Sequence, residues 1–413
     1  MWYYAFMYTF HRFFFAFMRV LVRFWFGLTG HYRCPKYSPR SKPSLILTNH
    51  NTNWDFFYFG APFRGHMYFV ASEHIFRLGF VSQLIRFLAD PIARKKGASS
   101  QETIEEIKRR LSKGQNVCMM AEGNRSFTGE TGFISPMTAR LAKECGAGLI
   151  TFRLHGGYFV NPRWSKETRK GKVWGELGGQ YTPEELSAMT EEEVASLIER
   201  DLFVDAFADQ RKMHYTYKAK APAETLETAL FACPDCKAFA RLRSHGNRLT
   251  CDACGGEHVL TDEGFFARPD GSAPAFETIA EWSEWQKGHL QKRIHEMQAS
   301  KDVSPIRSDE GAKLYRVHPL EGKSLIAEGT VRLYTDRLEV GGDEDRPGKP
   351  VSELQKDLLT ISLDSMKSMA VILVNTILFT AGDEYYELRL SPRASALQYL
   401  IAYFDLKGKE YKR

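Results

Sequence analysis

Two residues with side chains for acid–base chemistry, His50 and Asp55, follow a short apolar run at residues 45–47. On one continuous helix, five residues turn through about 500°, so these side chains would point apart. They meet only where the backbone turns, with His50 in a loop after a buried strand and Asp55 near the start of a helix. Asp55 could then hold one imidazole nitrogen and leave the other to act as a base. A polar loop without chemistry is the alternative that this pair alone leaves open.

A second apolar run, at residues 117–120, also ends in a polar loop, which carries the carboxylate of Glu122 and the guanidinium of Arg125. Between the two loops, Arg94 follows a proline turn and precedes Lys95 and Lys96. Guanidinium groups bind phosphate through a bidentate fork, so two arginines in one pocket favour an anionic ligand. A solvated surface turn is the alternative for Arg94.

Short apolar runs alternate with helical patterns between Ser44 and Gly179. This alternation predicts an α/β domain with a mixed or mostly parallel central sheet in a layered arrangement. The predicted strands are residues 45–48, 67–71, 117–121 and 149–152. Sites in such sheets lie at the carboxyl ends of strands, which is where His50 and Glu122 are expected.

Together the two loops resemble the signatures of the glycerolipid acyltransferase superfamily, in particular 1-acylglycerol-3-phosphate acyltransferases. The first signature, Asn-His followed by four residues and Asp, is matched by Asn49, His50 and Asp55. The third is usually Pro-Glu-Gly-Thr-Arg-Ser; here Ala121 replaces the Pro and Asn124 replaces the Thr. The fourth signature lacks its Pro in this chain, so no role is carried over to that strand.

The resemblance covers about residues 40–180 and implies transfer of a fatty acyl group from acyl-CoA or acyl carrier protein to the free hydroxyl of 1-acylglycerol-3-phosphate. His50 would be the general base and Asp55 would orient it. No catalytic cofactor is implied, because an acyl thioester is already activated. Another lipid or an amine acceptor stays open as an alternative. The residues that the resemblance places in substrate binding are Asn49, Arg94, Glu122, Gly123, Asn124, Arg125 and Ser126.

The first 54 residues contain no acidic residue but seven cations, although the whole chain has a net charge of only +6. Residues 1–30 are rich in aromatic side chains, and no charge-free run there reaches the ~20 residues that span a bilayer. On a helix, Arg12, Arg19 and Arg23 fall within about 40° of one another. This pattern predicts an amphipathic helix at a membrane interface, with its arginines reaching lipid phosphates. A helix covered by the protein's own core is the alternative.

Four cysteines form two C-x2-C pairs separated by fourteen residues: Cys233, Cys236, Cys251 and Cys254. This spacing is typical of a zinc ribbon, in which four thiolates complete a tetrahedral, structural site. The other three cysteines form no such pattern, which favours a reducing compartment over a disulfide framework. Zinc ribbons also occur in nucleic-acid-binding proteins, and a non-catalytic, membrane-associated zinc-ribbon module is the alternative outside enzymes. Nucleic acid is disfavoured as a partner, because no aromatic platform accompanies the basic residues of the ribbon.

The remaining chain predicts a helix at residues 276–298, a linker to 311, seven short strands and a closing helix, a pattern that resembles a pleckstrin-homology-like β-barrel. The expected domains are 1–30 (interfacial helix), 31–220 (acyltransferase), 221–275 (zinc ribbon), 276–311 (helix and linker) and 312–413 (β-barrel). We therefore expect a peripheral membrane protein on the cytoplasmic face. A homo-oligomer is compatible with the sequence.

Overall fold

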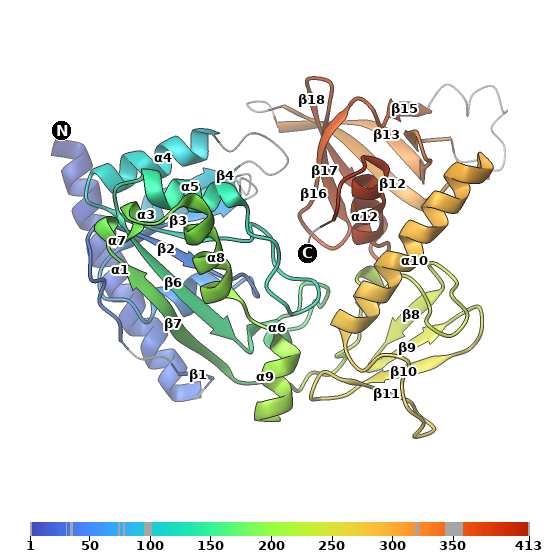
Figure 1. Cartoon of the computed structure of the whole chain (residues 1–413), viewed down its shortest axis with the longest axis horizontal. Helices are drawn as coiled ribbons and strands as arrows, with labels where there is room; N and C mark the ends of the chain where they lie inside the picture. Colours follow the sequence, from blue (N-terminus) through green and yellow to red (C-terminus); the bar gives the residue numbers. More distant parts are fainter. Residues whose placement is uncertain are drawn as a thin grey trace.

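The computed structural model describes residues 2–29, 31–33, 36–72, 75–76, 79–94, 101–318, 322–342 and 358–411. Figure 1 shows two lobes joined side by side. One lobe is an α/β layer structure built from the first half of the chain. The other combines a small cysteine-containing sheet, a long helix and a C-terminal antiparallel sheet.

The first lobe is organised around a sheet with the strand order β1-β7-β6-β2-β5-β3-β4. From β6 to β4 the neighbouring strands are parallel, whereas β7 runs antiparallel to β6. The four strands predicted from the sequence are present as β2, β3, β5 and β6, which confirms the mostly parallel sheet. The strands are β1 (Tyr32–Arg33), β2 (Ser44–Thr48), β3 (Met67–Ser72), β4 (Ile92–Arg94), β5 (Asn116–Met120), β6 (Gly148–His155) and β7 (Val173–Tyr181).

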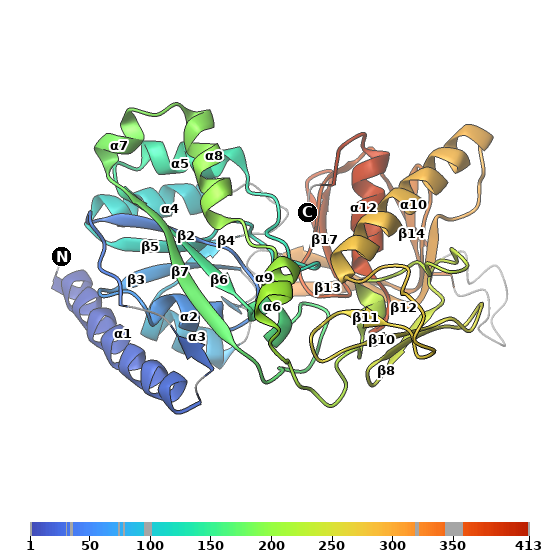
Figure 2. The ribbon, with the colours of Figure 1, turned by 60° about the horizontal axis from the view of Figure 1, so that its bottom comes forward.

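Helices cover both faces of this sheet (Figure 2). One face carries α4 (Gln101–Ser112), α5 (Pro136–Glu144), α7 (Pro183–Ser187) and α8 (Glu191–Leu202). The other carries α1 (Trp2–Thr29), α2 (Asp55–Gly60) and α3 (Phe80–Ala89), while α6 (Gly157–Val160) and α9 (Ala206–Met213) lie towards the second lobe. The helix starts agree with capping chemistry, since α7 and α8 each begin with a Thr–Glu capping box.

Helix α1 packs on the first lobe through one side and leaves an aromatic side exposed. Its Phe26 is buried against Tyr58 of α2, with ring centroids 5.1 Å apart. Two of the three arginines also contact the lobe, because Arg19 and Arg23 each donate one Nη1 hydrogen bond to one of its backbone carbonyls. The helical periodicity predicted that these arginines share one face of the helix, but it did not predict which way that face points. Among the described residues, we find no helix with both the length and the apolar character needed to cross a bilayer.

The second lobe begins with a four-stranded antiparallel sheet that carries the cysteine pairs. Its elements are η2 (Leu226–Thr228), β8 (Leu242–His245), β9 (Arg248–Cys251), β10 (Glu257–Leu260) and β11 (Phe266–Ala267). Helix α10 (Ile279–Ser300) starts at a capping box on Thr278 and packs on this sheet. Its buried Trp282 donates from Nε1 to the carbonyl of Ala232 at 2.9 Å.

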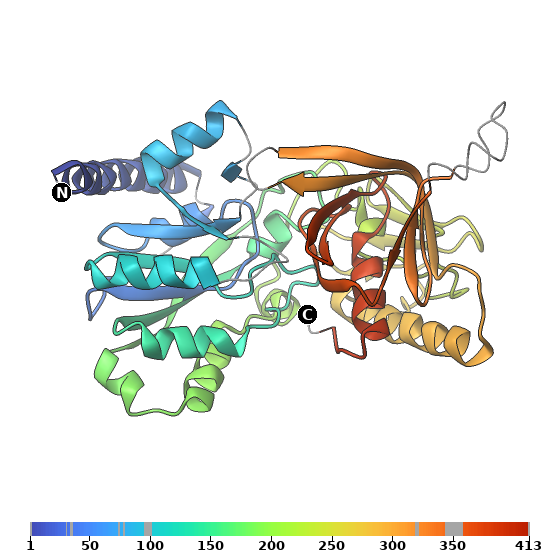
Figure 3. The same ribbon diagram turned by 90° about the horizontal axis from the view of Figure 1, so that it is seen from above.

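The C-terminal sheet has the order β15-β14-β13-β12-β18-β17-β16, with antiparallel neighbours throughout. The predicted strands and closing helix are present, but in the described residues β15 and β16 do not pair, so the predicted barrel closure is not observed. Strands β12 and β13 form a hairpin that projects along the upper side of Figure 3. The elements are β12 (Arg307–His318), β13 (Gly322–Leu333), β14 (Arg337–Val340), β15 (Leu359–Ser362), β16 (Met366–Val371), β17 (Thr376–Ala381), β18 (Glu384–Arg389) and α12 (Ala396–Leu406).

Candidate active site

His50 and Asp55 meet at the carboxyl end of β2. His50 Nδ1 lies 2.8 Å from Asp55 Oδ2, and the exposed fractions of the two side chains are 22% and 1%. The backbone turns between them, because His50 lies in the loop after β2 and Asp55 is the first residue of α2. A buried carboxylate on Nδ1 selects the tautomer with its proton there, so Nε2 is the nitrogen that can accept a proton.

The carboxylate of Asp55 is fixed by the loop that it caps. Its Oδ2 also accepts from the backbone N–H of Asn51 at 2.7 Å, and its Oδ1 accepts from the N–H and the hydroxyl of Thr52 at 3.0 and 2.7 Å. Its place at the start of α2 adds the favourable end of the helix dipole. These contacts satisfy the buried charge and hold it in one orientation towards the imidazole.

Glu122 joins the second loop to the backbone of His50. Its Oε1 accepts from the N–H of His50 and its Oε2 from the N–H of Gly132, each at 2.6 Å. Glu122 was expected to bind substrate; in the structure its two carboxylate oxygens accept from these backbone donors. Burial raises the pKa of Glu122 to about 8, and the nearby charge of Asp55 acts in the same direction.

Ser126 and Asn49 also act on the loop backbone. The N–H of Ser126 donates to the carbonyl of His50 at 3.1 Å. The second loop therefore bonds to both backbone groups of His50, to its N–H through Glu122 and to its carbonyl through Ser126. The buried amide of Asn49 exchanges two hydrogen bonds, of 2.8 and 2.9 Å, with the backbone of Leu154 in β6. Asn49 was expected to bind substrate, but this pairing makes it a positioning residue for the His50 loop.

The structure brings Arg94 to the second loop. Gly123 has φ of +68°, and a Cβ there would collide with the Arg94 guanidinium. The backbone conformation favours glycine at this position, and the absence of a side chain lets the arginine approach closely. Arg94 ends β4, and burial lowers the pKa of its guanidinium. Lys95 and Lys96, which follow it, lie outside the described residues.

Arg125 lies in the same loop, next to the half-buried Asn124. Its Nη1 donates to Asn161 Oδ1 at 2.8 Å, and burial lowers its pKa to about 10 while the charge of Asp55 opposes this shift. Two guanidinium groups, those of Arg94 and Arg125, thus border the loop that holds the His50 backbone. This arrangement can bind an anion beside a general base.

Asn161 and Arg163 belong to this site but were not identified from the sequence. Arg163 is buried over the ring of Phe127, and its Nη1 donates to the carbonyl of Arg125 at 2.9 Å. Its Nη2 donates to the carbonyl of Val371 at 2.6 Å, on the edge strand β16 of the C-terminal sheet. Arg163 therefore connects the second loop to the C-terminal sheet. The signal in the sequence was a polar Asn-Pro-Arg segment soon after a buried strand.

The four cysteines of the second lobe converge on one point. Their Sγ atoms all lie within 4.8 Å of one another, and those of the pairs Cys233–Cys254 and Cys236–Cys251 are 3.8 and 3.7 Å apart. Four thiolates at ~2.3 Å from a tetrahedral zinc ion would be about 3.8 Å apart. The donor set and its spacing therefore fit zinc, with no position left for a substrate or water.

One comparison with known proteins, that with protein-family models, agrees with the class of site. Residues 31–155 match the protein-family model described as Acyltransferase, a stretch that includes His50, Asp55 and the Glu122 loop. The chain therefore carries an acyltransferase domain. Among solved structures, it is similar to the crystal structure of the 1-acyl-sn-glycerophosphate (LPA) acyltransferase PlsC from Thermotoga maritima, with 17% identity and a TM-score of 0.36, over 46% of this chain and 78% of that one. The search of curated proteins found no match.

Proposed function

We propose that the protein transfers a fatty acyl group from acyl-CoA or an acylated carrier protein to the free hydroxyl of 1-acylglycerol-3-phosphate. The observation that carries this proposal is the His50–Asp55 pair at 2.8 Å, set in a loop that is hydrogen-bonded to the second loop, which Arg94 and Arg125 border. A base beside two guanidinium groups suits an acceptor that carries both a hydroxyl and a phosphate.

In the proposed reaction, His50 Nε2 takes the proton of the acceptor hydroxyl as its oxygen attacks the thioester carbonyl. The tetrahedral intermediate then collapses with cleavage of the C–S bond, and the proton on the imidazolium passes to the leaving thiolate. The products are the diacylated glycerol phosphate and a free thiol. Asp55 stabilises the imidazolium and keeps its proton-accepting nitrogen directed away from α2. No covalent acyl-enzyme is required, because the thioester is already activated.

Arg94 and Arg125 would hold the acceptor phosphate. Each is half-buried, so its charge is less screened than at the surface and its interaction with a dianion is stronger. The bond to Asn161 fixes the plane of the Arg125 guanidinium and leaves further N–H groups for the ligand. Glu122, Asn49 and Ser126 would keep the two loops in register and would not touch the acceptor.

An exposed apolar surface supports attachment to a membrane as a peripheral protein. On α1 and α3 it includes Phe13 and Phe80, which are 73% and 77% exposed, and Figures 2 and 3 place these helices on the same side of the lobe. Trp54 and Phe56 flank Asp55 in the sequence and are also exposed, so the surface extends towards the site. Patches of this kind mark membrane or partner contacts. Bound zinc at four reduced cysteines would favour the cytoplasmic face.

Zinc would have a structural role in the second lobe. Cys233, Cys236, Cys251 and Cys254 would be its ligands, and the ion would hold the small sheet on which α10 packs. The segment around this small sheet contacts the C-terminal part of the chain, for example through the 2.7 Å bond from Ser395 Oγ, at the start of α12, to the carbonyl of Thr228 in η2. The metal would therefore also support the C-terminal sheet that Arg163 contacts.

The proposal is tested by incubating the purified full chain in mixed micelles with radiolabelled palmitoyl-CoA and a panel of acceptors. The panel contains 1-acylglycerol-3-phosphate, 1-acylglycerol, lysophosphatidylcholine, lysophosphatidylethanolamine and sphingosine. We expect the highest kcat/KM with the acceptor that bears a terminal phosphate. Equal or higher values with 1-acylglycerol would contradict the role of the two arginines, and preference for sphingosine would indicate an amine acceptor.

A further inference from the structure

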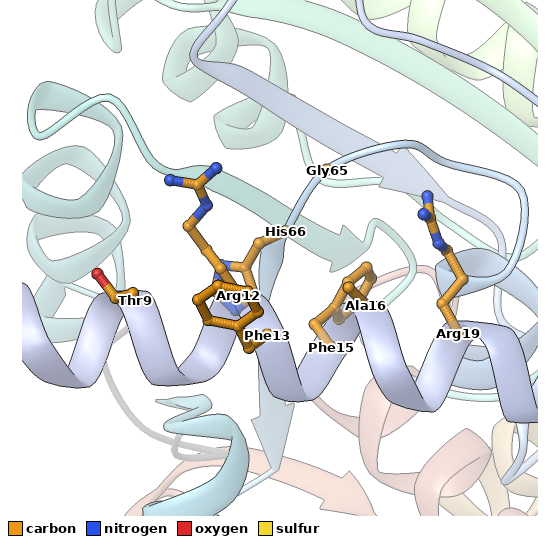
Figure 4. Close-up of a pocket in the computed structure, with 8 residues that line it drawn as sticks. All are labelled: Thr9, Arg12, Phe13, Phe15, Ala16, Arg19, Gly65 and His66. Carbon is orange, nitrogen blue, oxygen red and sulfur yellow. The ribbon is translucent and has the colours of Figure 1, made fainter.

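A cavity of about 360 Å³ lies between α1 and residues 65–66, which lead into β3. Figure 4 shows Arg12 and Arg19 reaching from α1 on the side of the helix where Gly65 and His66 lie. The lining side chains combine cationic, aromatic and small residues: Thr9, Arg12, Phe13, Phe15, Ala16, Arg19, Gly65 and His66.

Arginines concentrate positive charge around this cavity. Arg12 and Arg19 line it, and Arg23 and Arg64 are close enough to act on the guanidinium of Arg19. Within the described residues, none of these four arginines forms an ion pair with a carboxylate. Burial, together with the charges of Arg23 and Arg64, lowers the pKa of Arg19. An anion bound among them would relieve this repulsion.

Part of the cationic surface is already held in place. Arg19 Nη1 donates to the carbonyl of Phe63 at 2.8 Å, and Arg23 Nη1 donates to that of Ala61 at 2.9 Å. A guanidinium has five N–H donors, so one such bond fixes its plane without using its capacity for a ligand. In the described part of the chain, the buried Nδ1 of His66 has no hydrogen-bond partner, and His66 lines the same cavity. The cavity is thus partly preorganised for a polar ligand.

The cavity also lies at the depth where a phosphate would be found. At ~100° per residue, Arg12 and Arg19 are about 100–160° around α1 from the exposed Phe13 and Phe17. If the exposed aromatic side enters the acyl region of a membrane, the two arginines point away from that region, towards the headgroups. The apolar wall formed by Phe13 and Phe15 suits the glycerol and acyl part of a lipid better than a free ion.

This cavity is separate from the proposed active site. Strand β3 runs parallel to β5, which is parallel to β2, and the cavity adjoins the amino end of β3. His50 follows the carboxyl end of β2, so the two sites lie at opposite ends of the parallel strands of this sheet. We propose that the α1 cavity binds the phosphate of an anionic membrane phospholipid that is not the acceptor. This inference rests on the proposed membrane attachment and adds a specific lipid site to it.

Binding is measured by isothermal titration calorimetry of the full chain with dihexanoyl phosphatidylglycerol below its micelle concentration. We expect saturable binding that Arg12→Gln weakens by at least about tenfold, the loss typical of one charge-assisted hydrogen bond. The matched control is Lys36→Gln, which removes one exposed cation near the same segment but outside the cavity lining. This control should change the affinity by less than about twofold.

Two further measurements separate the possibilities. Inorganic phosphate at the same concentration should not displace the lipid, and displacement would show a site for a free anion. The variant Arg12→Gln should keep wild-type turnover with a soluble short-chain acceptor, whereas His50→Ala should keep wild-type phosphatidylglycerol binding. Equal affinities of wild type, Arg12→Gln and Lys36→Gln would overturn the lipid site while leaving the proposed reaction intact. Arg19→Gln, measured in the same way, repeats the test at the second arginine.

Discussion

Replacing Asp55 with Asn removes one charge from the site with almost no change in shape. Asp55 accepts four hydrogen bonds, two on each oxygen, from His50, Asn51 and Thr52. If the Asn amide nitrogen replaces Oδ2, the N–H of Asn51 loses its acceptor, and His50 Nδ1 can pair only as an acceptor, with its proton moved to Nε2. If it replaces Oδ1, the N–H of Thr52 loses its acceptor, because only the Thr52 hydroxyl can rotate and accept instead. Each arrangement leaves one backbone N–H unpaired, and the second keeps the tautomer that His50 needs as a base.

The expected magnitudes follow from this arrangement. One unsatisfied backbone N–H costs ~1–3 kcal/mol, and the loss of charge weakens the other bonds, so we expect ~2–4 kcal/mol lower unfolding free energy. For catalysis, the imidazolium loses its stabilising charge. General-base catalysis contributes about 10²–10⁴ in rate, and the Asp→Asn change in serine protease triads costs about 10⁴. We expect kcat to fall by about 10³. The acceptor KM should change by less than about threefold, because Asp55 is buried behind the imidazole.

The assay is steady-state acyl transfer to 1-acylglycerol-3-phosphate, with the melting temperature measured on the same preparation. The matched control is Asp209→Asn, because Asp209 Oδ2 forms a second carboxylate–histidine pair with His155 Nδ1 at 2.6 Å, outside the proposed site. That variant should keep kcat within about threefold. A folded Asp55→Asn protein with kcat within tenfold of wild type would refute the role of the carboxylate in catalysis.

Three other predictions concern the second loop and the cysteine cluster. Arg125→Lys keeps the charge but loses the bidentate guanidinium and its bond to Asn161, so KM for the phosphate-bearing acceptor should rise about tenfold. An equal rise in KM for 1-acylglycerol would exclude a contact between Arg125 and the phosphate. Burial raises the pKa of Glu122 from 4.5 to about 8, so between these two pH values Glu122 is protonated in the folded state and ionised in the unfolded state. Over this range the unfolding free energy of wild type should therefore fall, relative to that of Glu122→Gln, as pH rises. A pH-independent difference in urea denaturation would contradict that shift. The purified chain should contain one zinc ion by mass spectrometry. Cys236→Ser should lower both the zinc content and the melting temperature, whereas the control Cys145→Ser, at a half-buried cysteine outside the cluster, should change neither. A wild-type chain that is purified without metal and is as stable as the zinc-loaded chain would refute the zinc site.

The core of the first lobe could be predicted because its strands are short apolar runs. Residues 45–47 and 117–119 are continuous apolar segments, as expected for parallel strands buried on both faces. Strand β7 was missed because it contains three glycines, which weaken any strand pattern. Tertiary packing explains two of these glycines: a Cβ at Gly175 would collide with the ring of Phe152, and one at Gly178 would collide with the carbonyl of Asp201.

The sequence could predict contacts of the site between residues close in the chain, but not those between residues far apart in it. The five-residue spacing of His50 and Asp55 required a turn, and the structure contains that turn. By contrast, the bond between Arg163 and the carbonyl of Val371 joins residues 208 positions apart, and no local pattern indicates such a contact. The orientation of Asn49 towards β6 is likewise set by the neighbouring strand. The outward side of α1 depends on the packing of Phe26 against Tyr58 and of the buried His11, whose Nδ1 lies 3.2 Å from the Tyr68 hydroxyl. Periodicity alone does not determine these contacts.

The most direct test of the central claim is the turnover of His50→Ala with radiolabelled palmitoyl-CoA and 1-acylglycerol-3-phosphate, measured alongside acceptor binding. His50 contributes its backbone to Glu122 and Ser126 whatever its side chain, so the two loops should stay joined. We expect kcat to fall by at least about 10³, with acceptor affinity within about threefold of wild type. Turnover within tenfold of wild type would show that another group removes the proton, and would contradict the proposed mechanism.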